Sequence, residues 1–407
     1  MAINGKKVQR SSDLKRKTEI PKGAGQVAFR ELPCENGYSK IAIATLDNPS
    51  SLNALSFHML VELKQQLEQW QRDPSIACVV LEGSGEKAFC AGGDVRAMYD
   101  VMYTKSKAEA QEFFEAYFTV EYQCDYLIHT YSKPLIAWGE GIVMGGGMGL
   151  YMGAEFKVVT PKSRLAMPEI NIGLYPDVGG TWFLNQLDQG VGLFLGLTGS
   201  MVNATDAEAI GFADAVILPE HKQNLFEQLQ HIGWEALDDE SQAVKELIYS
   251  LSKMASADKP DPLLIPYLDA VKFACMKGDT VTVVGEILSL DVPITSPSYK
   301  WFESAKSALR SGSPITAHIC FAQTHQYRSL SLADCFRFEL GLSVRCGLLG
   351  EFQEGVRARL IDKDGNPNWL YKGVDEVPNT TMDELFAPLW TESQHPLRAL
   401  GQIQEEQ

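Results

Sequence analysis

The chain has 407 residues, of which 45% are hydrophobic, and a formal net charge of −16. This length exceeds one average domain and predicts either two lobes or one domain with a large extension. The acidic balance argues against nucleic-acid binding, which needs a basic surface. No apolar run reaches the roughly 20 residues that span a bilayer, so no membrane partner is expected.

Basic residues gather at the start of the chain, where the first 30 positions hold eight lysines and arginines against only Asp13 and Glu19. This segment lacks the apolar core of a secretory signal. A transit peptide is an open alternative, but the two acids and the Pro/Gly stretch at 21–25 favour a flexible basic tail over residues 1–25. The eight cysteines are scattered without a CxxC pair, and the histidines show no ligand spacing. The composition predicts a reduced, cytoplasmic protein with no metal site and no separate cofactor.

The first structured elements alternate between strand and helix. Strand patterns occupy 26–30 and 40–46, and a short buried strand is predicted at 77–81. Between the strands at 40–46 and 77–81, Ser56 can cap a helix. Its apolar residues recur at the spacing of an amphipathic helix: Leu60, Leu63, Leu67 and Trp70. This strand–helix–strand order predicts α/β construction.

A long helical pattern follows residue 94. Four of its aromatic residues share one face at i, i+4 spacing: Phe114, Phe118, Tyr122 and Tyr126. A cofactor contact is conceivable for this aromatic stripe, but core packing is the favoured interpretation. Further strands are predicted at 134–140 and 156–160, a helix from Met148, and a loop-rich segment at 165–180.

Helical patterns dominate the last part of the chain, and runs of β-branched residues become scarce there. We place a boundary near residue 235. It separates an α/β core at 26–235 from a mostly helical C-terminal lobe at 236–407.

Two glycine-rich turns each follow a predicted strand and precede a helix: FCAGGD at 89–94, and GGG at 145–147 after the strand at 134–140. Glycine lets the backbone approach a ligand closely, and the start of a helix presents free N–H groups. Either turn alone could be merely structural. Together they could offer one N–H each to a single carbonyl oxygen, which is the design of an oxyanion hole. The GGG turn matches neither a phosphate-binding loop nor a dinucleotide fingerprint.

A third segment, MPEINIGLYPDVGG at 167–180, places Glu169 and Asp177 among apolar residues, proline and glycine. Such surroundings can raise the pKa of a carboxyl group and suit it to acid–base work. The structural alternative is a helix cap or a turn acid, and for Asp177 this alternative is equally well supported by the residues alone.

In this order and spacing, the three segments resemble the crotonase (enoyl-CoA hydratase/isomerase) superfamily over about residues 26–235. Within it, the 167–180 motif and the runs EFQEGVRA at 351–358 and LIDKD at 360–364 are most similar to the 3-hydroxyisobutyryl-CoA hydrolase subfamily. The resemblance implies a spiral of ββα turns with a mostly helical C-terminal region. It also implies hydrolysis of a short 3-hydroxyacyl-CoA in valine breakdown, with coenzyme A as part of the substrate.

The resemblance implies a role for each motif residue. Gly93 and Gly146 would donate the N–H groups of the oxyanion hole. Glu169 would be the main catalytic carboxylate, attacking the thioester or activating water, and Asp177 would bind the 3-hydroxyl group or assist proton transfer. Asp100 stands where the hydrolases usually have a glutamate that lines the substrate site. Substrate contacts are also expected at three other motif residues: Phe89, Ala91 and Asp94.

Gly149 bears on the choice of reaction, because hydratases of the superfamily carry a second catalytic glutamate at this position. Glycine cannot activate water, so hydrolysis is favoured over hydration. An isomerase with Glu169 as its lone base is an alternative, and a non-catalytic acyl-CoA-binding protein is another. A homo-oligomer such as a trimer is also implied, unless the C-terminal lobe covers the usual interface.

Overall fold

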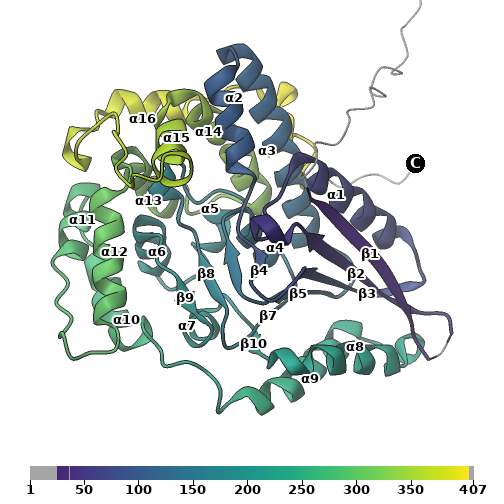
Figure 1. Cartoon of the computed structure of the whole chain (residues 1–407). Helices are drawn as coiled ribbons and strands as arrows, with labels where there is room; N and C mark the ends of the chain where they lie inside the picture. Colours follow the sequence, from purple (N-terminus) through teal and green to yellow (C-terminus); the bar gives the residue numbers. More distant parts are fainter. Residues whose placement is uncertain (1–24, 36, 403–407) are drawn as a thin grey trace, which may run out of the picture.

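The computed structural model describes residues 25–35 and 37–402 (Figure 1). The basic tail predicted for residues 1–25 therefore lies, apart from Gly25, outside the described residues. The strands are β1 Gln26–Pro33, β2 Lys40–Asp47, β3 Ile76–Gly83, β4 Ala88–Cys90, β5 Leu135–Gly139, β6 Ile142–Met144, β7 Phe156–Val159, β8 Arg164–Ala166, β9 Val202–Asn203 and β10 Ala215–Val216. The helices are α1 Phe57–Arg72, α2 Val95–Thr104, α3 Lys107–His129, α4 Gly146–Met152, α5 Gly180–Phe183, α6 Val191–Thr198, α7 Ala204–Ile210, α8 Lys222–His231, α9 Glu240–Ser252, α10 Leu268–Cys275, α11 Thr280–Leu288, α12 Tyr299–Ser311, α13 Pro314–His325, α14 Leu332–Leu349, α15 Glu351–Val356 and α16 Asn379–Phe386.

The strands form two sheets. The larger has the order β1-β2-β3-β5-β7-β10, and all its neighbours are parallel except β1 and β2. The smaller has the order β4-β6-β8-β9, in which only β8 and β9 are antiparallel. Consecutive strands alternate between the sheets, with β3, β5 and β7 in one and β4, β6 and β8 in the other. Each such pair leads into a helical segment, so the expected ββα spiral is confirmed.

The parallel pairing of β4, β6 and β8 positions the three sequence motifs. Parallel neighbours end at the same edge of a sheet. The segments that leave these strands, 91–94, 145–147 and 167–169, therefore emerge side by side although they lie far apart in the sequence.

The first helix begins where the sequence predicted. The Ser56 side chain accepts a hydrogen bond from the Met59 N–H, and α1 ends at Arg72, before Asp73. The predicted apolar face is buried against the first sheet and α3. The helical pattern after residue 94 forms two helices rather than one, because Ser106 and Glu109 make a capping box that starts α3.

The aromatic stripe of α3 packs in the core, as predicted. Phe114, Phe118 and Tyr122 are buried, and Tyr126 is partly buried against the same cluster. The Tyr122 and Phe336 rings lie 5.8 Å apart between centroids, so α3 packs against α14 of the C-terminal region.

Two boundary predictions around the second glycine turn were wrong. A tight turn at Gly141 divides the predicted strand at 134–140 from an additional short strand, β6, and the GGG turn follows β6 rather than β5. Gly141 has a φ of +72°, and a Cβ there would lie 2.3 Å from the Lys87 carbonyl oxygen, so the turn needs glycine. The following helix begins at Gly146, two residues before the predicted Met148.

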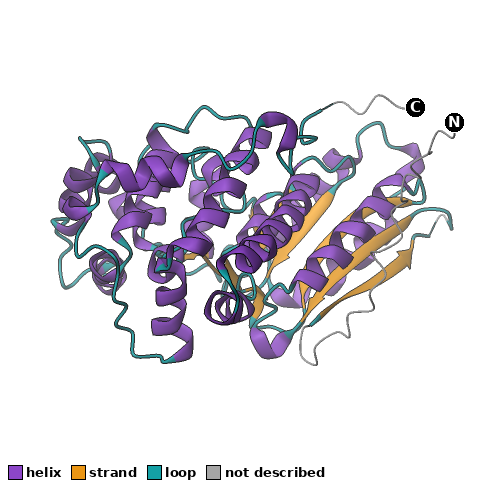
Figure 2. Cartoon of the chain, turned by 90° about the horizontal axis from the view of Figure 1, so that it is seen from above, coloured by secondary structure: helices purple, strands orange, loops and turns teal. Residues whose placement is uncertain are grey.

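The C-terminal region is largely helical, and residues 236–402 contain no strand. Figure 2 shows this helix-rich half beside the half that holds the sheets. The main hydrophobic core nevertheless includes residues from both sides of position 235, and a second cluster lies between the larger sheet, α8 and α9. The exact domain boundary near residue 235 stays a prediction.

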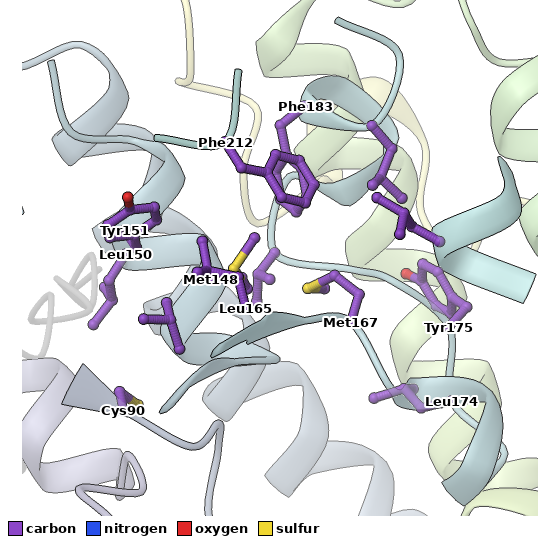
Figure 3. Close-up of a cluster of buried hydrophobic side chains, with 14 of the residues drawn as sticks. Cys90, Met148, Leu150, Tyr151, Leu165, Met167, Leu174, Tyr175, Phe183 and Phe212 are labelled. Carbon is purple, nitrogen blue, oxygen red and sulfur yellow. The ribbon is translucent and has the colours of Figure 1, made fainter. Parts of the chain in front are cut away.

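The core also anchors the segment that follows β8. Figure 3 shows Leu165 and Met167 in one cluster with Met148 of α4 and with Phe183 and Phe212. Within the described residues, no helix is long and apolar enough to cross a bilayer. All eight cysteines are buried and free.

Candidate active site

The two glycine turns lie against each other at the edge of the smaller sheet. A Cβ placed on Gly146 would lie 3.2 Å from the Gly93 nitrogen, and one on Gly92 would lie 3.7 Å from the Gly146 nitrogen. Neither the Gly93 nor the Gly146 N–H donates a hydrogen bond to any residue that the structure describes. Two backbone donors without a partner, from turns that follow different strands, thus lie close together.

Close approach explains why these turns are built from glycine. Gly92 and Gly145 have φ angles of +110° and +52°, which side chains rarely tolerate. A Cβ on Gly147 would lie only 2.3 Å from the Cys90 carbonyl oxygen. Larger residues would therefore separate the turns and move the two N–H groups apart.

Both turns open into a cavity of about 730 Å³. Its walls include the turns, the segment after β8 and one face of α12. Gly93, Gly146, Glu169, Asp177 and Ala91 line it, which brings five of the predicted site residues together.

Glu169 begins a short 3₁₀ turn, Glu169–Ile172, and its side chain faces the second glycine turn. Its Oε1 lies 3.0 Å from the position that a Cβ on Gly145 would take. Glu169 is 4% exposed, and its Oε2 has no hydrogen-bond partner. Burial raises the pKa of Glu169 well above its ordinary value, and the charge of Asp177 raises this pKa further. A carboxylate without solvating partners is a strong base and nucleophile.

Asp177 is also buried, and its Oδ2 accepts a hydrogen bond of 2.7 Å from the Tyr122 hydroxyl. Burial raises the pKa of Asp177 to about 6, although the bond from Tyr122 acts in the opposite direction. Ser343 Oγ lies 2.6 Å from the Tyr122 hydroxyl and 2.7 Å from that of Tyr175. A network of hydroxyl groups that extends to Ser343 of the C-terminal region thus supports this carboxylate.

The turn after Asp177 holds an unfavourable backbone conformation. Val178, a β-branched residue, has a φ of +52°, and Gly179 has a φ of +87°. Residues in such regions persist only where surrounding contacts hold them. Glu339 of α14 supplies these contacts, because its carboxylate accepts hydrogen bonds of 2.8 Å from the N–H groups of Gly179 and Thr181.

Glu339 is fully buried, and burial raises its pKa to about 8 despite these hydrogen bonds. The sequence gave no indication of this contact, because more than 150 residues separate Glu339 from the turn that it holds.

Glu121 is a site residue that the sequence analysis missed. It is 2% exposed, lines the cavity and places Oε1 2.7 Å from the position that a Cβ on Gly146 would take. Burial raises the pKa of Glu121 well above its ordinary value, and the charge of Asp177 adds to this effect. The available signal was its place three residues after Phe118, on the apolar face of α3.

The structure places Asp100, which was expected to line the substrate site, away from the cavity. Asp100 is exposed and does not border the cavity, whereas Val95 and Met98 of the same helix do. The reason is helical geometry: two residues beyond Met98, a side chain points about 200° away around the helix. In α3, by contrast, Glu121 lines the cavity beside Glu169 and Asp177.

Two further residues that were expected to contact the substrate, Phe89 and Asp94, make contacts within the protein instead. Phe89 is fully buried and packs edge-on against Tyr151, at 6.2 Å between ring centroids. Asp94 caps α2, its carboxylate accepting a hydrogen bond of 3.1 Å from the Ala97 N–H. Neither residue lines the cavity. Among the residues the structure describes, no cluster of His, Cys, Asp and Glu could hold a metal ion.

Comparison with known proteins identifies the family. A family model described as enoyl-CoA hydratase/isomerase matches residues 41–386. The chain belongs to the enoyl-CoA hydratase/isomerase family. This family membership confirms the resemblance of the three motifs and identifies the α/β spiral as the crotonase fold.

Similar members of the family come from several kingdoms. The chain is 33% identical over 368 residues to "3-hydroxyisobutyryl-CoA hydrolase, mitochondrial" of Danio rerio, covering 90% of this chain and 91% of that protein. It is 33% identical over 358 residues to the "3-hydroxyisobutyryl-CoA hydrolase-like protein 1, mitochondrial" of Arabidopsis thaliana, covering 87% and 85% of the two chains. The cellular location of the present family member stays a prediction.

Solved family structures match nearly the whole chain. A crystal structure of an enoyl-CoA hydratase from Rhodobacter sphaeroides 2.4.1 has a TM-score of 0.74 at 28% identity, covering 89% of this chain and 98% of that one. A carnitinyl-CoA dehydratase from Mycobacterium thermoresistibile has a TM-score of 0.75 at 27% identity, covering 89% and 97%. The chain is therefore an acyl-CoA enzyme of the crotonase family in its fold and its motifs.

Proposed function

We propose that this family member hydrolyses a short 3-hydroxyacyl-CoA thioester, with 3-hydroxyisobutyryl-CoA as the preferred substrate. The observation that carries the proposal is the buried Glu169 carboxylate beside two unused N–H donors, those of Gly93 and Gly146. The names of the similar proteins from Danio rerio and Arabidopsis thaliana support the same reaction.

In the proposed mechanism the thioester oxygen accepts hydrogen bonds from Gly93 and Gly146. Each such donor typically contributes roughly 10²–10³ in rate, because negative charge develops on this oxygen in the transition state. Backbone donors fixed by packed glycine turns need little reorganisation as the charge forms.

Glu169 then acts by one of two routes. In the first, one of its oxygens bonds to the carbonyl carbon, the C–S bond breaks and CoA thiolate leaves, and water opens the resulting mixed anhydride. In the second, Glu169 takes a proton from water, whose oxygen bonds to the carbonyl carbon as the C–S bond breaks. Rapid-quench mass spectrometry of a single turnover distinguishes these routes, because only the first attaches the acyl group to Glu169.

Asp177 and Glu121 are the proposed partners of the 3-hydroxyl group, since both are buried acids that line the cavity. A polar site of this kind discriminates against an analogue without the hydroxyl group, because its buried oxygens then stay unpaired. The lack of an acid at Gly149 supports hydrolysis over hydration.

A panel of CoA esters tests the proposal. We expect thiol release from 3-hydroxyisobutyryl-CoA and 3-hydroxypropionyl-CoA, and much slower release from isobutyryl-CoA. Glu169→Gln should lower kcat by about 10³-fold or more while leaving ester binding intact. A double-bond shift in an enoyl-CoA without thiol release would instead identify an isomerase. Tight binding without any turnover would identify a non-catalytic acyl-CoA-binding protein.

A further inference from the structure

The cavity continues beyond the catalytic acids to a wall formed by the C-terminal region. The five-residue π-helix Arg357–Ile361 contributes Arg359 and Leu360 to this wall. Facing residues come from α12 at i, i+3, i+4 and i+7, the spacing of one helix face: Ser304, Ser307, Ala308 and Ser311. This wall adds one guanidinium and three serine hydroxyls to the cavity that holds the catalytic acids.

Arg359 is the only lysine or arginine among the described residues that line the cavity. Its Nη2 donates hydrogen bonds to Asn171 Oδ1 at 3.2 Å and to Ser311 Oγ at 3.4 Å, both neutral acceptors. Its Nε is buried and has no hydrogen-bond partner. Within the described part of the chain, no carboxylate forms an ion pair with Arg359.

Arg357, only two residues away, differs from Arg359 because its guanidinium is paired with carboxylates. Its guanidinium donates hydrogen bonds to the carboxylates of Glu354, Asp362 and Asp364 at 2.6 to 2.8 Å. A guanidinium stays charged in proteins, and a partly buried charge without a counter-charge is costly. In a chain of net charge −16, an arginine that faces a cavity without a carboxylate partner is suited to an anionic ligand.

The other residues of the cavity indicate which kind of anionic group Arg359 would bind. The part of the cavity near the glycine turns holds three buried acids, Glu121, Glu169 and Asp177. Their negative charges disfavour a carboxylate on the acyl group of the substrate. Arg359 lies on another wall, together with serine hydroxyls. Arg96 reaches the same segment from the first turn of α2, with its Nη2 donating to the Leu360 carbonyl oxygen at 3.0 Å. Guanidinium and hydroxyl donors together are typical of a phosphate site.

We propose that Arg359 binds a phosphoryl group of the nucleotide half of the CoA ester. This inference rests on the proposed use of an acyl-CoA substrate. The diphosphate and the 3′-phosphate of coenzyme A offer the same chemistry to Arg359. Arg359 is thus proposed as a binding residue and not as a catalytic one.

Titration calorimetry with free CoA tests the inference independently of turnover. Arg359→Met keeps the alkyl stem but removes the charge, and it should weaken CoA binding by about 10- to 100-fold, the usual effect of losing a charge-assisted hydrogen bond. Arg359→Lys should restore part of the affinity. Arg328→Met is the control, because Arg328 is exposed and does not line this cavity.

Ligands that lack some or all of the phosphoryl groups of CoA identify the group that Arg359 binds. Hydrolysis of the pantetheine thioester should be equal in the wild type and Arg359→Met, whereas kcat/KM for the CoA thioester should fall. If the 3′-phosphate is the partner, the variant and the wild type will bind dephospho-CoA equally. If the diphosphate is the partner, dephospho-CoA binding will weaken as much as CoA binding.

Three results would overturn the inference: unchanged CoA affinity in Arg359→Met, equal losses for the CoA and pantetheine thioesters, or wild-type CoA affinity that is insensitive to salt. The last measurement does not depend on whether the variant folds. Failure of the proposed hydrolysis gives a different pattern, in which Arg359 still governs CoA affinity but no ester turns over.

Discussion

Both carboxylate oxygens of Asp125 lie 3.0 Å from the point that a Cβ on Gly149 would occupy. Val178 Cβ lies 2.6 Å from the same point. The space where other family members are expected to carry a catalytic glutamate is therefore filled from α3 and from the strained turn after Asp177. Asp125 itself is fully buried and does not line the cavity.

Gly149→Ala should destabilise the protein by about 1–3 kcal/mol, the usual cost of overpacking a core. Gly149→Glu should be more damaging and should not create hydratase activity, because no space exists for the longer side chain. Urea denaturation and a crotonyl-CoA hydration assay measure these effects. Gly285→Ala is the matched control, since its Cβ meets no atom within 4 Å and it lies exposed in α11. Equal stabilities of the two alanine variants would contradict this packing.

Asp125→Asn should change how stability depends on pH. Burial raises the pKa of Asp125 well above its ordinary value, and charges on Glu121 and Asp177 raise it further. Folding therefore takes up a proton once the pH exceeds the unfolded-state pKa of about 3.9, and wild-type stability falls as pH rises from there toward the higher folded pKa.

Asparagine cannot ionise, so the free energy of unfolding of Asp125→Asn relative to the wild type should grow as the pH rises above about 3.9. Urea titrations at three pH values measure the difference. Asp100→Asn controls for the loss of one carboxyl group at an exposed position. A difference that stays constant with pH would contradict the buried, protonated state of Asp125.

Tyr122→Phe should shift the pH profile of kcat/KM. The Tyr122 hydroxyl donates to Asp177 and favours its ionised form, so its removal should raise the pKa of Asp177 above the present value of about 6. The limb of the profile that belongs to Asp177 should move to higher pH. Tyr175→Phe is the control, because Tyr175 contacts Ser343 and the Glu339 carbonyl but not Asp177. The same shift in both variants would refute a direct effect.

Glu339→Gln should loosen the turn that carries Asp177. Glutamine offers one oxygen where the carboxylate offers two, so the N–H of Gly179 or Thr181 loses its acceptor. We expect a loss of about 1–3 kcal/mol in stability, faster hydrogen exchange in residues 177–183 and a lower kcat. Glu384→Gln, on the exposed face of α16, is the control. Unchanged exchange in 177–183 would show that Glu339 does not hold this turn.

Glu121→Gln and Asp100→Asn form a matched pair of acid-to-amide changes. The first alters a buried wall of the cavity and should raise KM for 3-hydroxyacyl-CoA by about 10-fold or more, whereas the second should leave the kinetics unchanged. Steady-state thiol release measures both. Loss of activity in Asp100→Asn alone would instead support Asp100, and not Glu121, as the acid that contacts the substrate.

The sequence predicted the parts of this protein that depend on local pattern. Periodicity and capping residues gave the helix after Ser56, the early strands and the helical C-terminal region, because neighbouring residues determine these features. The resemblance of the three motifs to the crotonase superfamily indicated Gly93, Gly146, Glu169 and Asp177. Each of these residues lies in a segment that follows a short strand of the smaller sheet.

Only the tertiary structure decided which side chains complete the site. Glu121 and Arg359 enter the cavity from helical segments more than 200 residues apart, and Glu339 holds a turn from which more than 150 residues separate it. Sequence proximity to Asp94 does not give the direction of the Asp100 side chain, which the rotation of α2 turns to solvent. Contacts between distant segments depend on how helices pack and on which face each presents, and that information is spread over the whole chain rather than held in any one motif.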